Sequence, residues 1–365
     1  MRIKHWLIKI VAHLDFPLLL LLFALMLLSL FVQYSASGED NGRLMAHVLN
    51  MLIALGVMVL VANIPPQYLI ALAVPVYTTG VILLIGVALF GDVANGSRRW
   101  LHLGFTRIQP SEILKIGAPL MLAWYFHHHE ATLRLKDYGI AMLLLAIPVA
   151  LVARQPDLGT ALLIAASGFY VLFFAGLPWR ILIGSVIAGT ASLPVIWHFL
   201  HDYQKKRVLT LLSPDQDPLG AGYHIIQSCI AIGSGGSFGK GWLQGTQSHL
   251  DFLPEHTTDF VFAVFGEEFG LLGNTLLLLL YLAIIARGLI IASNAPTLFA
   301  RLMAGSITLA FFTYAFVNMG MVSGILPVVG IPLPMMSYGG TAMVIVMLGF
   351  GIVMSLKTHR KLIKS

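Results

Sequence analysis

The stretch FPLLLLLFALMLLSLFV, residues 16–32, is apolar throughout and holds no charged side chain. With its neighbours it makes a predicted span at 14–34, close to the roughly 20 residues that a helix needs to cross a hydrocarbon core of about 30 Å. No small-residue cleavage site follows it before the next apolar run, so we expect a retained membrane helix and not a signal peptide. This stretch predicts a chain that crosses a lipid bilayer.

The composition of the whole chain agrees with this prediction. Of 365 residues, 58% are hydrophobic and 10% are charged, whereas soluble domains carry about 25% charged residues. The mean hydropathy is +0.86. An ordinary water-soluble fold is therefore excluded. The single cysteine, Cys229, cannot form an internal disulfide.

We predict an all-α polytopic membrane protein with about ten transmembrane helices. The expected spans are 14–34, 44–63, 68–91, 110–127, 138–153, 158–176, 179–200, 262–286, 300–322 and 337–356. They form a single membrane domain over residues 1–365, within which residues 201–261 make one large loop. Lysine and arginine are more frequent on the side of the two termini, which predicts cytoplasmic termini and an extracytoplasmic large loop.

The stretch LDFLPEHTTDFVFAVFGEEFG, residues 250–270, gathers five of the sixteen acidic residues. We expect Thr257 or Thr258 to start a helix with Asp259 in its first turn, where the helix dipole favours a carboxylate. At the membrane interface Asp259 would be partly desolvated, which raises the pKa of a carboxyl group and makes it a stronger base. Alternatively, these acids only cap a helix and solvate a loop. Because acids that border spans are usually functional, the cluster is a candidate site.

A second constellation is RRWLHLGFTRIQPSEILK, residues 98–115. Glu112 and Lys115 are three residues apart, so they share one face of a helix that begins near Pro110. An intramembrane lysine needs a partner: Glu112 is the local candidate and Asp157 the distant one. The pair either fixes helix packing only or lines a charged cavity that opens outward. Trp100 is either part of that cavity or an interfacial anchor.

The third constellation is the glycine-rich segment IGSGGSFGKGW, residues 232–242, which contains Lys240. Glycines let backbone N–H groups approach an anion closely. The alternative is a flexible loop with solvated lysines. The basic and acidic groups predicted on the outer side make up the candidate substrate-binding set: Arg98, Trp100, Glu112, Lys115, Asp157, Lys240 and Glu255.

These groups fit a lipid-linked pyrophosphate sugar. Cations neutralise its leaving group, so one carboxylate base that activates an acceptor hydroxyl suffices. The rival class is a transporter or lipid flippase, in which the same charges line a pathway. A pathway should continue into the cytoplasmic half of the spans, where few ionisable residues occur. This asymmetry favours a one-sided enzyme.

Four motifs carry a resemblance to a known family: RRWLHLGFTRIQPSE at 98–112, RQPDLGTA at 154–161, GTQSHLDFLPEHTTDFVFAVFGEEFG at 245–270 and LPVVGIPLPMMSYGGTA at 326–342. Through them nearly the whole chain resembles the SEDS family (shape, elongation, division and sporulation), which includes FtsW, RodA and SpoVE. The segment LDFLPEHTTDF resembles the RodA branch more than the FtsW branch. The resemblance implies the SEDS fold and a peptidoglycan glycosyltransferase that polymerises lipid II at the outer face of the bacterial inner membrane.

The resemblance also implies roles and partners. Asp259 matches the essential aspartate of the family's TDF motif and would be the general base, with undecaprenyl pyrophosphate leaving; Glu112 and Lys115 match the pair that lines its central cavity. A class B penicillin-binding protein would supply the transpeptidase, beside other elongation-complex membrane proteins, and no nucleic acid is expected. A divalent cation, Mg²⁺ or Mn²⁺, is an optional cofactor with Asp251 and Glu255 as candidate ligands. The rival function is a lipid II flippase or another polytopic transporter.

Overall fold

The computed structural model describes residues 12–94, 97–102, 107–199, 202–214, 217, 220–250, 252–253 and 255–359. The elements in chain order are α2 (Phe16–Ala36), α3 (Asn41–Ala62), α4 (Pro66–Phe90), β1 (Asp92–Ala94), β2 (Ser97–His102), β3 (Arg107–Ile108), α5 (Pro110–His128), η1 (Glu130–Thr132), α6 (Leu135–Ala153), α7 (Leu158–Phe174), α8 (Trp179–Phe199), α9 (Asp202–Leu212), α10 (Ala221–Ser234), α11 (Thr246–His249), α12 (Val261–Ser293), α13 (Leu298–Val322) and α14 (Gly340–Thr358). Each of the ten predicted spans corresponds to one of these helices, as the all-α polytopic fold requires. The three short strands form one antiparallel sheet in the order β1-β2-β3.

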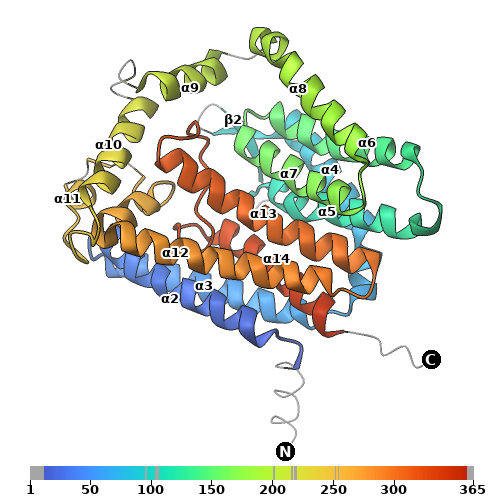
Figure 1. Cartoon of the computed structure of the whole chain (residues 1–365), viewed down its shortest axis with the longest axis horizontal. Coiled ribbons are helices and arrows are strands. Elements are labelled where there is room, and N and C mark those ends of the chain that lie inside the picture. Colours follow the sequence, from blue (N-terminus) through green and yellow to red (C-terminus); the bar gives the residue numbers. More distant parts are fainter. Residues whose placement is uncertain are drawn as a thin grey trace, which may run out of the picture.

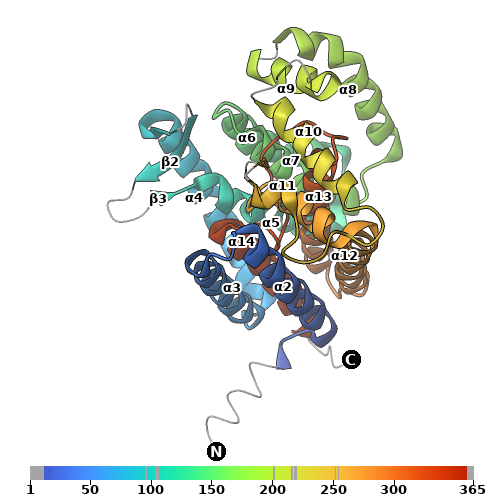
Figure 2. The ribbon, with the colours of Figure 1, turned by 90° about the vertical axis from the view of Figure 1, so that its left-hand side faces the viewer.

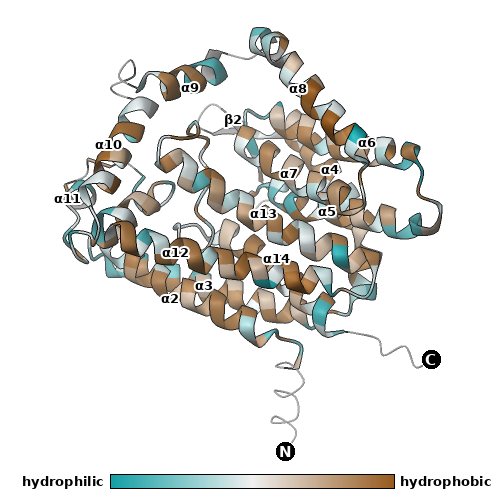
Figure 3. Cartoon of the chain, viewed as in Figure 1, coloured by the Kyte–Doolittle hydropathy of each residue, from teal (hydrophilic) through white to brown (hydrophobic). Residues whose placement is uncertain are grey.

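Within the described ranges, seven helices are long and apolar enough to cross a membrane: α2, α3, α4, α6, α12, α13 and α14. The apolar helix α7 is shorter, at 17 residues. Helix α5 is less apolar because it carries Glu112, Lys115 and two histidines. Figure 3 shows hydrophobic residues along the helix shafts and hydrophilic residues gathered at helix ends and in the connections.

Helix α13 is the most enclosed of the spans. It packs on α12, α7, α5 and α14, while α14 also packs along α3, and α4 packs on α5. Figures 1 and 2 show α13 running through the middle of the bundle, with α8 and α9 at the edge farthest from α2 and α3. Side chains of α13 can therefore reach groups on several other helices.

A buried carboxylate joins the two ends of the described chain. Asp15 caps α2 by accepting from the Leu18 N–H, and it also accepts from Arg287 of α12, at 2.8 Å, and from Lys357 of α14. A buried carboxylate with two cationic donors is well satisfied. The start of α2 and the end of α14 therefore lie on the same side of the bundle, as expected for an even number of spans.

The glycine-rich segment packs on a break in α12. Gly270 has a φ of 64° and interrupts the helix. The N–H groups of Lys240 and Gly241 donate to the carbonyls of Glu267 and Glu268, both at 3.0 Å, and Leu271 N donates to Gly236 O at 2.9 Å. A Cβ at Gly239 would lie 2.0 Å from Glu268 O, so only glycine permits this approach.

This packing changes the interpretation of residues 232–242. Backbone groups freed at a helix break inside a membrane protein must find new partners. The glycine-rich segment supplies those partners, so the N–H groups of Lys240 and Gly241 are not available to an anion. In this structure these two N–H groups bind the carbonyls of α12, so they give no support to the alternative in which the segment binds an anion.

Candidate active site

Asp259 lies in a tight turn that precedes α12. The N–H groups of Thr258 and Phe260 both donate to the carbonyl of Glu255, at 3.0 and 3.2 Å, and Glu255 has a φ of 53°. The helix begins only at Val261. The prediction that Asp259 occupies the first turn of the helix is therefore wrong, because the turn closes back on Glu255 before the helix starts.

Three buried side chains hold the backbone of this turn at consecutive carbonyls. Gln33 Nε2 of α2 donates to Thr257 O at 2.9 Å, and Ser337 Oγ donates to Thr258 O at 2.6 Å. Asn318 Nδ2 of α13 donates to Asp259 O at 2.8 Å. Gln33, Asn318 and Ser337 are each at most 4% exposed. Because each carbonyl has its own donor, the peptide of Asp259 is fixed in one place.

The surroundings of the Asp259 carboxyl group favour its protonated form. Burial, together with the nearby Glu255 carboxylate, raises the pKa of Asp259 to about 6. Gly330 lies beside this carboxylate, since a Cβ added to it would be 3.4 Å from Asp259 Oδ2. A carboxylate with a pKa near neutrality is matched to general-base work at physiological pH.

The predicted pair in α5 is present. Lys115 Nζ donates to Glu112 Oε1 at 2.6 Å, and both side chains are at most 15% exposed. The ammonium also lies 5.5 Å from the centre of the Tyr314 ring, within reach of a cation–π interaction. Lys115 therefore has an acidic partner on its own helix and an aromatic one on α13.

Asp157 is not the partner of Lys115. Its Oδ2 accepts from Gln109 at 3.3 Å and lies 3.9 Å from Arg99 Nε, while its Oδ1 caps α7 by accepting from Thr160 N. Of the two candidate partners, the structure therefore shows the local one, Glu112, because the start of α7 turns the Asp157 carboxylate toward β2. Asp157 instead ties α7 to the segment that leads into α5.

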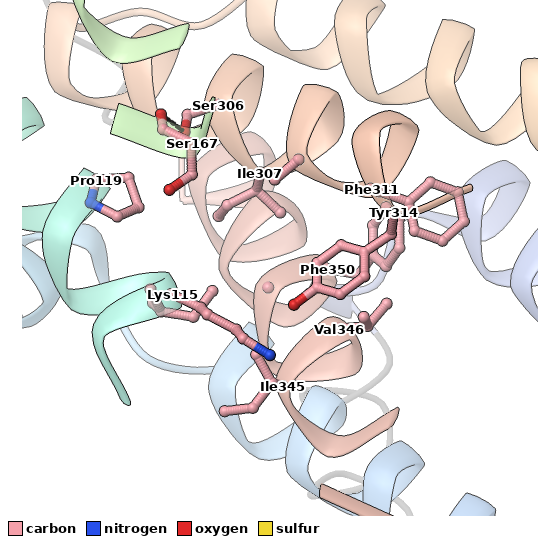
Figure 4. Close-up of a pocket in the computed structure, with 13 residues that line it drawn as sticks. Lys115, Pro119, Ser167, Ser306, Ile307, Phe311, Tyr314, Ile345, Val346 and Phe350 are labelled. Carbon is pink, nitrogen blue, oxygen red and sulfur yellow. Dashed lines mark hydrogen bonds between the residues drawn. The ribbon is translucent and has the colours of Figure 1, made fainter. Parts of the chain in front are cut away.

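Two cavities border the Glu112–Lys115 pair. A pocket of about 390 Å³ is lined by residues of α3, β2, α5 and α14, among them Trp100 and Glu112. A smaller cavity of about 40 Å³ is lined by Lys115, and Figure 4 shows this side chain extending into it beside Tyr314 and Phe350. The larger pocket combines apolar walls with a carboxylate, which suits a ligand with a polar head and an apolar chain.

Helix α13 links the pair to the Asp259 turn. Tyr314 contacts Lys115, and Asn318 binds the Asp259 carbonyl. Residues four apart share a helix face and differ by about 6 Å along the axis. Helix α13 therefore contacts both predicted groups from two residues about one helical turn apart, since Tyr314 reaches Lys115 and Asn318 reaches the backbone of Asp259.

Lys240 makes contacts within the protein. Its Nζ donates to Glu267 Oε1 at 2.6 Å and to Thr246 Oγ1 at 2.8 Å. Glu267 is fully buried and also accepts from the Thr246 and Gln247 N–H groups, at 2.9 and 3.1 Å. The charge of Lys240 is therefore engaged by Glu267 in this structure, and a role in substrate binding stays a prediction.

Glu267→Gln is expected to loosen this arrangement locally. The amide keeps only one acceptor oxygen where the carboxylate serves four donors, which should cost about 1–3 kcal/mol. Hydrogen exchange at the amides of Thr246 and Gln247 should rise roughly 10- to 100-fold, as followed by mass spectrometry. The control is Glu130→Gln, whose carboxylate is 55% exposed beside His127; equal exchange in both variants would contradict the assignment.

The remaining predicted residues are less informative. Glu255 is exposed, and its Oε2 accepts from Thr258 Oγ1 at 2.7 Å. Arg98 belongs to β2, but its side chain lies outside the described part of the structure, as does Asp251. Among the described residues no three His, Cys, Asp or Glu side chains come together as a metal site.

Sequence reasoning missed Gln33, Asn318, Tyr314 and Ser337. A signal for two of them was present, since Gln33 and Asn318 are polar residues inside otherwise apolar spans, where such side chains usually find a specific partner. What the pattern does not contain is the identity of that partner.

Comparison with known proteins decides the family. The sequence model of a family described as "Cell cycle protein", which groups FtsW, RodA and SpoVE, matches residues 7–362. The chain belongs to the FtsW/RodA/SpoVE family. This confirms the resemblance seen in the four motifs.

Relatives within this family are closely similar. The chain is 54% identical to the peptidoglycan glycosyltransferase MrdB of Escherichia coli (strain K12) over 352 residues, covering 96% of this chain and 95% of that protein. It superimposes with a TM-score of 0.81 and 34% identity on a chain from a solved peptidoglycan synthase complex that coordinates polymerization and crosslinking, covering 94% and 97% of the two chains. The rod shape determining protein RodA of Thermus thermophilus gives a TM-score of 0.71 at 30% identity, covering 95% and 97%. These matches confirm the FtsW/RodA/SpoVE fold over nearly the whole length.

Proposed function

We propose that this membrane protein is a RodA-type peptidoglycan glycosyltransferase that polymerises lipid II, with Asp259 as its general base. The observation that carries the proposal is the partly buried Asp259 carboxyl group, on a turn whose three backbone carbonyls are held by buried side chains. One of those side chains, Asn318, lies one helical turn along α13 from Tyr314, which contacts Lys115 of the Glu112–Lys115 pair. The names of the similar proteins MrdB and RodA support the reaction class.

The reaction is a substitution at an anomeric carbon. Asp259 takes the proton of the acceptor sugar's 4-hydroxyl as that oxygen attacks C1 of the donor muramyl sugar. The bond between C1 and the pyrophosphate oxygen breaks, undecaprenyl pyrophosphate leaves with the electron pair, and the configuration inverts from α to β. Because pyrophosphate is a stable anion, the leaving group needs no proton, and a single carboxylate suffices.

Positive charge near the leaving group lowers the barrier further. Lys115 pairs with Glu112, a residue that lines the 390 Å³ pocket, and its ammonium would stabilise the negative charge that develops on the leaving pyrophosphate. Arg98 and the predicted binding residues Trp100, Asp157, Lys240 and Glu255 stay candidates for contacts to the sugar and phosphate groups. A preorganised ammonium in a partly water-excluded site stabilises an anion more strongly than it would in water.

Among the described residues no three His, Cys, Asp or Glu side chains come together, and the candidate ligand Asp251 lies outside these residues. Glu255 is exposed and its carboxylate is engaged by Thr258, and no second carboxylate among the described residues completes a ligand set with it. A Mg²⁺ or Mn²⁺ ion that accompanies the pyrophosphate stays a proposal, which polymerisation in the presence of a chelator would test.

The proposed setting is the bacterial inner membrane, with both termini in the cytoplasm and the 201–261 segment outside. The lysine and arginine bias and the shared side of the two chain ends support this orientation. The proposed partner is a class B penicillin-binding protein that supplies crosslinking, and the similarity to a chain of a peptidoglycan synthase complex supports it. Other elongation-complex membrane proteins would bind the same assembly.

The rate of polymerisation is expected to fall at acid pH with a midpoint near pH 6. The base acts only when ionised, and burial raises the pKa of Asp259 to about 6, so the active fraction grows as pH rises through this value. Initial rates with labelled lipid II between pH 5 and pH 8, using the full chain with its transpeptidase partner, measure the profile.

Glu255→Gln supplies the matched variant for this profile. Removing the neighbouring charge that helps to raise the pKa of Asp259 should move the midpoint to lower pH. A rate that stays constant from pH 5 to pH 8 would contradict Asp259 as the base, and translocation of lipid II without polymerisation would favour the flippase alternative.

A further inference from the structure

Asn318 joins two segments that are distant in sequence. Its fully buried amide lies on α13, and Nδ2 donates to Asp259 O at 2.8 Å and to Ile331 O at 2.7 Å. A primary amide has two N–H donors, and both are used here. One side chain therefore fixes the spacing between the turn that carries Asp259 and the loop that carries Ile331.

The second segment faces the carboxylate itself. Gly330, which directly precedes Ile331, has a φ of 72° and would bring a Cβ to 3.4 Å from Asp259 Oδ2. Glycine adopts this backbone conformation without steric cost and leaves the space beside the carboxylate open. The position of this loop relative to the turn therefore decides how much room the carboxylate has.

The other two anchors of the turn make different connections. Gln33 binds the carbonyls of Thr257 and Met336, and Ser337 binds the carbonyl of Thr258. They hold the residues before Asp259. Only the Asn318 contacts, among those described for this turn, act on the peptide of Asp259 and on the residue next to Gly330 together.

We infer that Asn318 is a positioning residue for glycosyl transfer, which sets the placement of the Asp259 carboxylate against the Gly330 loop. The inference rests on the proposed function, since it assigns Asn318 a role through the base. Asn318 acts through the backbone of Asp259 and does not contact the substrate. Its contribution is to keep the carboxylate oxygen where it meets the acceptor hydroxyl, and displacement of a catalytic group by about 1 Å can cost roughly 100-fold in rate.

Asn318→Leu tests the inference, because leucine has a similar volume and no donor. The kcat for lipid II polymerisation by the full chain with its transpeptidase partner should fall roughly 10- to 100-fold while KM changes less than twofold. The acid limb of the pH–rate profile should also move below pH 6, because a released carboxylate reaches water and the pKa of Asp259 falls toward its ordinary value. Asn318→Ser, which keeps one donor, should lie between the wild type and Asn318→Leu.

The control is Thr308→Val on the same helix. Thr308 is also fully buried, and its hydroxyl donates to Ala304 O of its own helix. This variant should lose one buried hydrogen bond within α13, which joins no second segment, and should keep the wild-type kcat and acid limb. A shifted acid limb in Thr308→Val as well would assign the effect to general loosening of α13 and overturn the inference.

Two further outcomes are decisive. A kcat and pH profile of Asn318→Leu equal to those of the wild type, with Asp259→Asn inactive, would overturn the positioning role and leave the proposed function intact. Full activity of Asp259→Asn would instead remove the base assignment itself. If Asn318→Leu does not fold, Asn318→Ser carries the same test, and an unchanged acid limb there would count against the inference.

Discussion

Replacing Asp259 by asparagine is expected to lower the rate of lipid II polymerisation by about 100- to 10,000-fold, the usual contribution of a general base. The amide has the shape of the carboxyl group but cannot accept the proton of the acceptor hydroxyl. The measurement is the initial rate of glycan formation from labelled lipid II by the full chain with its transpeptidase partner. A rate within threefold of the wild type would exclude Asp259 as the base.

The same variant should fold at least as well as the wild type. Burial raises the pKa of Asp259 to about 6, above the value of about 3.9 for an unfolded aspartate. The folded state therefore binds this proton more tightly, and the stabilising contribution is present at acid pH and is lost as pH rises from about 4 to 6. At neutral pH asparagine removes that penalty, so the thermal midpoint of Asp259→Asn should equal or exceed that of the wild type.

Replacing Lys115 by methionine is expected to have the largest effect on stability. It leaves Glu112, whose side chain is 15% exposed, without its cationic partner inside the bundle. Breaking a buried ion pair from one side costs about 3–5 kcal/mol because the remaining charge is uncompensated. Thermal or denaturant unfolding in detergent measures the loss, and Lys136→Met, at an exposed lysine of the α6 start, is the control.

The double variant Glu112→Leu with Lys115→Leu separates packing from chemistry. Replacing both members of a buried pair by apolar side chains is often neutral for stability, so most of the lost stability should return. If Lys115 acts on the pyrophosphate, polymerisation should stay at least tenfold below the wild type. Recovery of both stability and rate would show that the pair serves packing alone.

The structure shows which partners the predicted site residues contact, while their roles in the reaction stay predictions. Glu112 and Lys115 could be paired because a spacing of three on a helix fixes their relation locally. The sequence could not choose between Glu112 and Asp157 as the partner of Lys115, since the direction of the Asp157 side chain depends on how α7 starts against β2. The prediction that Asp259 lies in the first turn of a helix was wrong, because the N–H groups of Thr258 and Phe260 bind the carbonyl of Glu255 before the helix starts.

What the sequence by itself determined is the set of helices that build the bundle, since each of the ten predicted spans corresponds to one helix. Hydropathy and helical periodicity are properties of neighbouring residues, so they can be read without knowing the fold. Tertiary structure alone decided that Gln33 meets Thr257, 224 positions away, and that Asn318 meets Asp259, 59 positions away. It also decided that backbone N–H groups of the glycine-rich segment bind the carbonyls at the break in α12. Buried polar groups must be paired, but which groups pair is settled only when all the helices have packed, because each donor takes whatever acceptor the assembled bundle brings within reach.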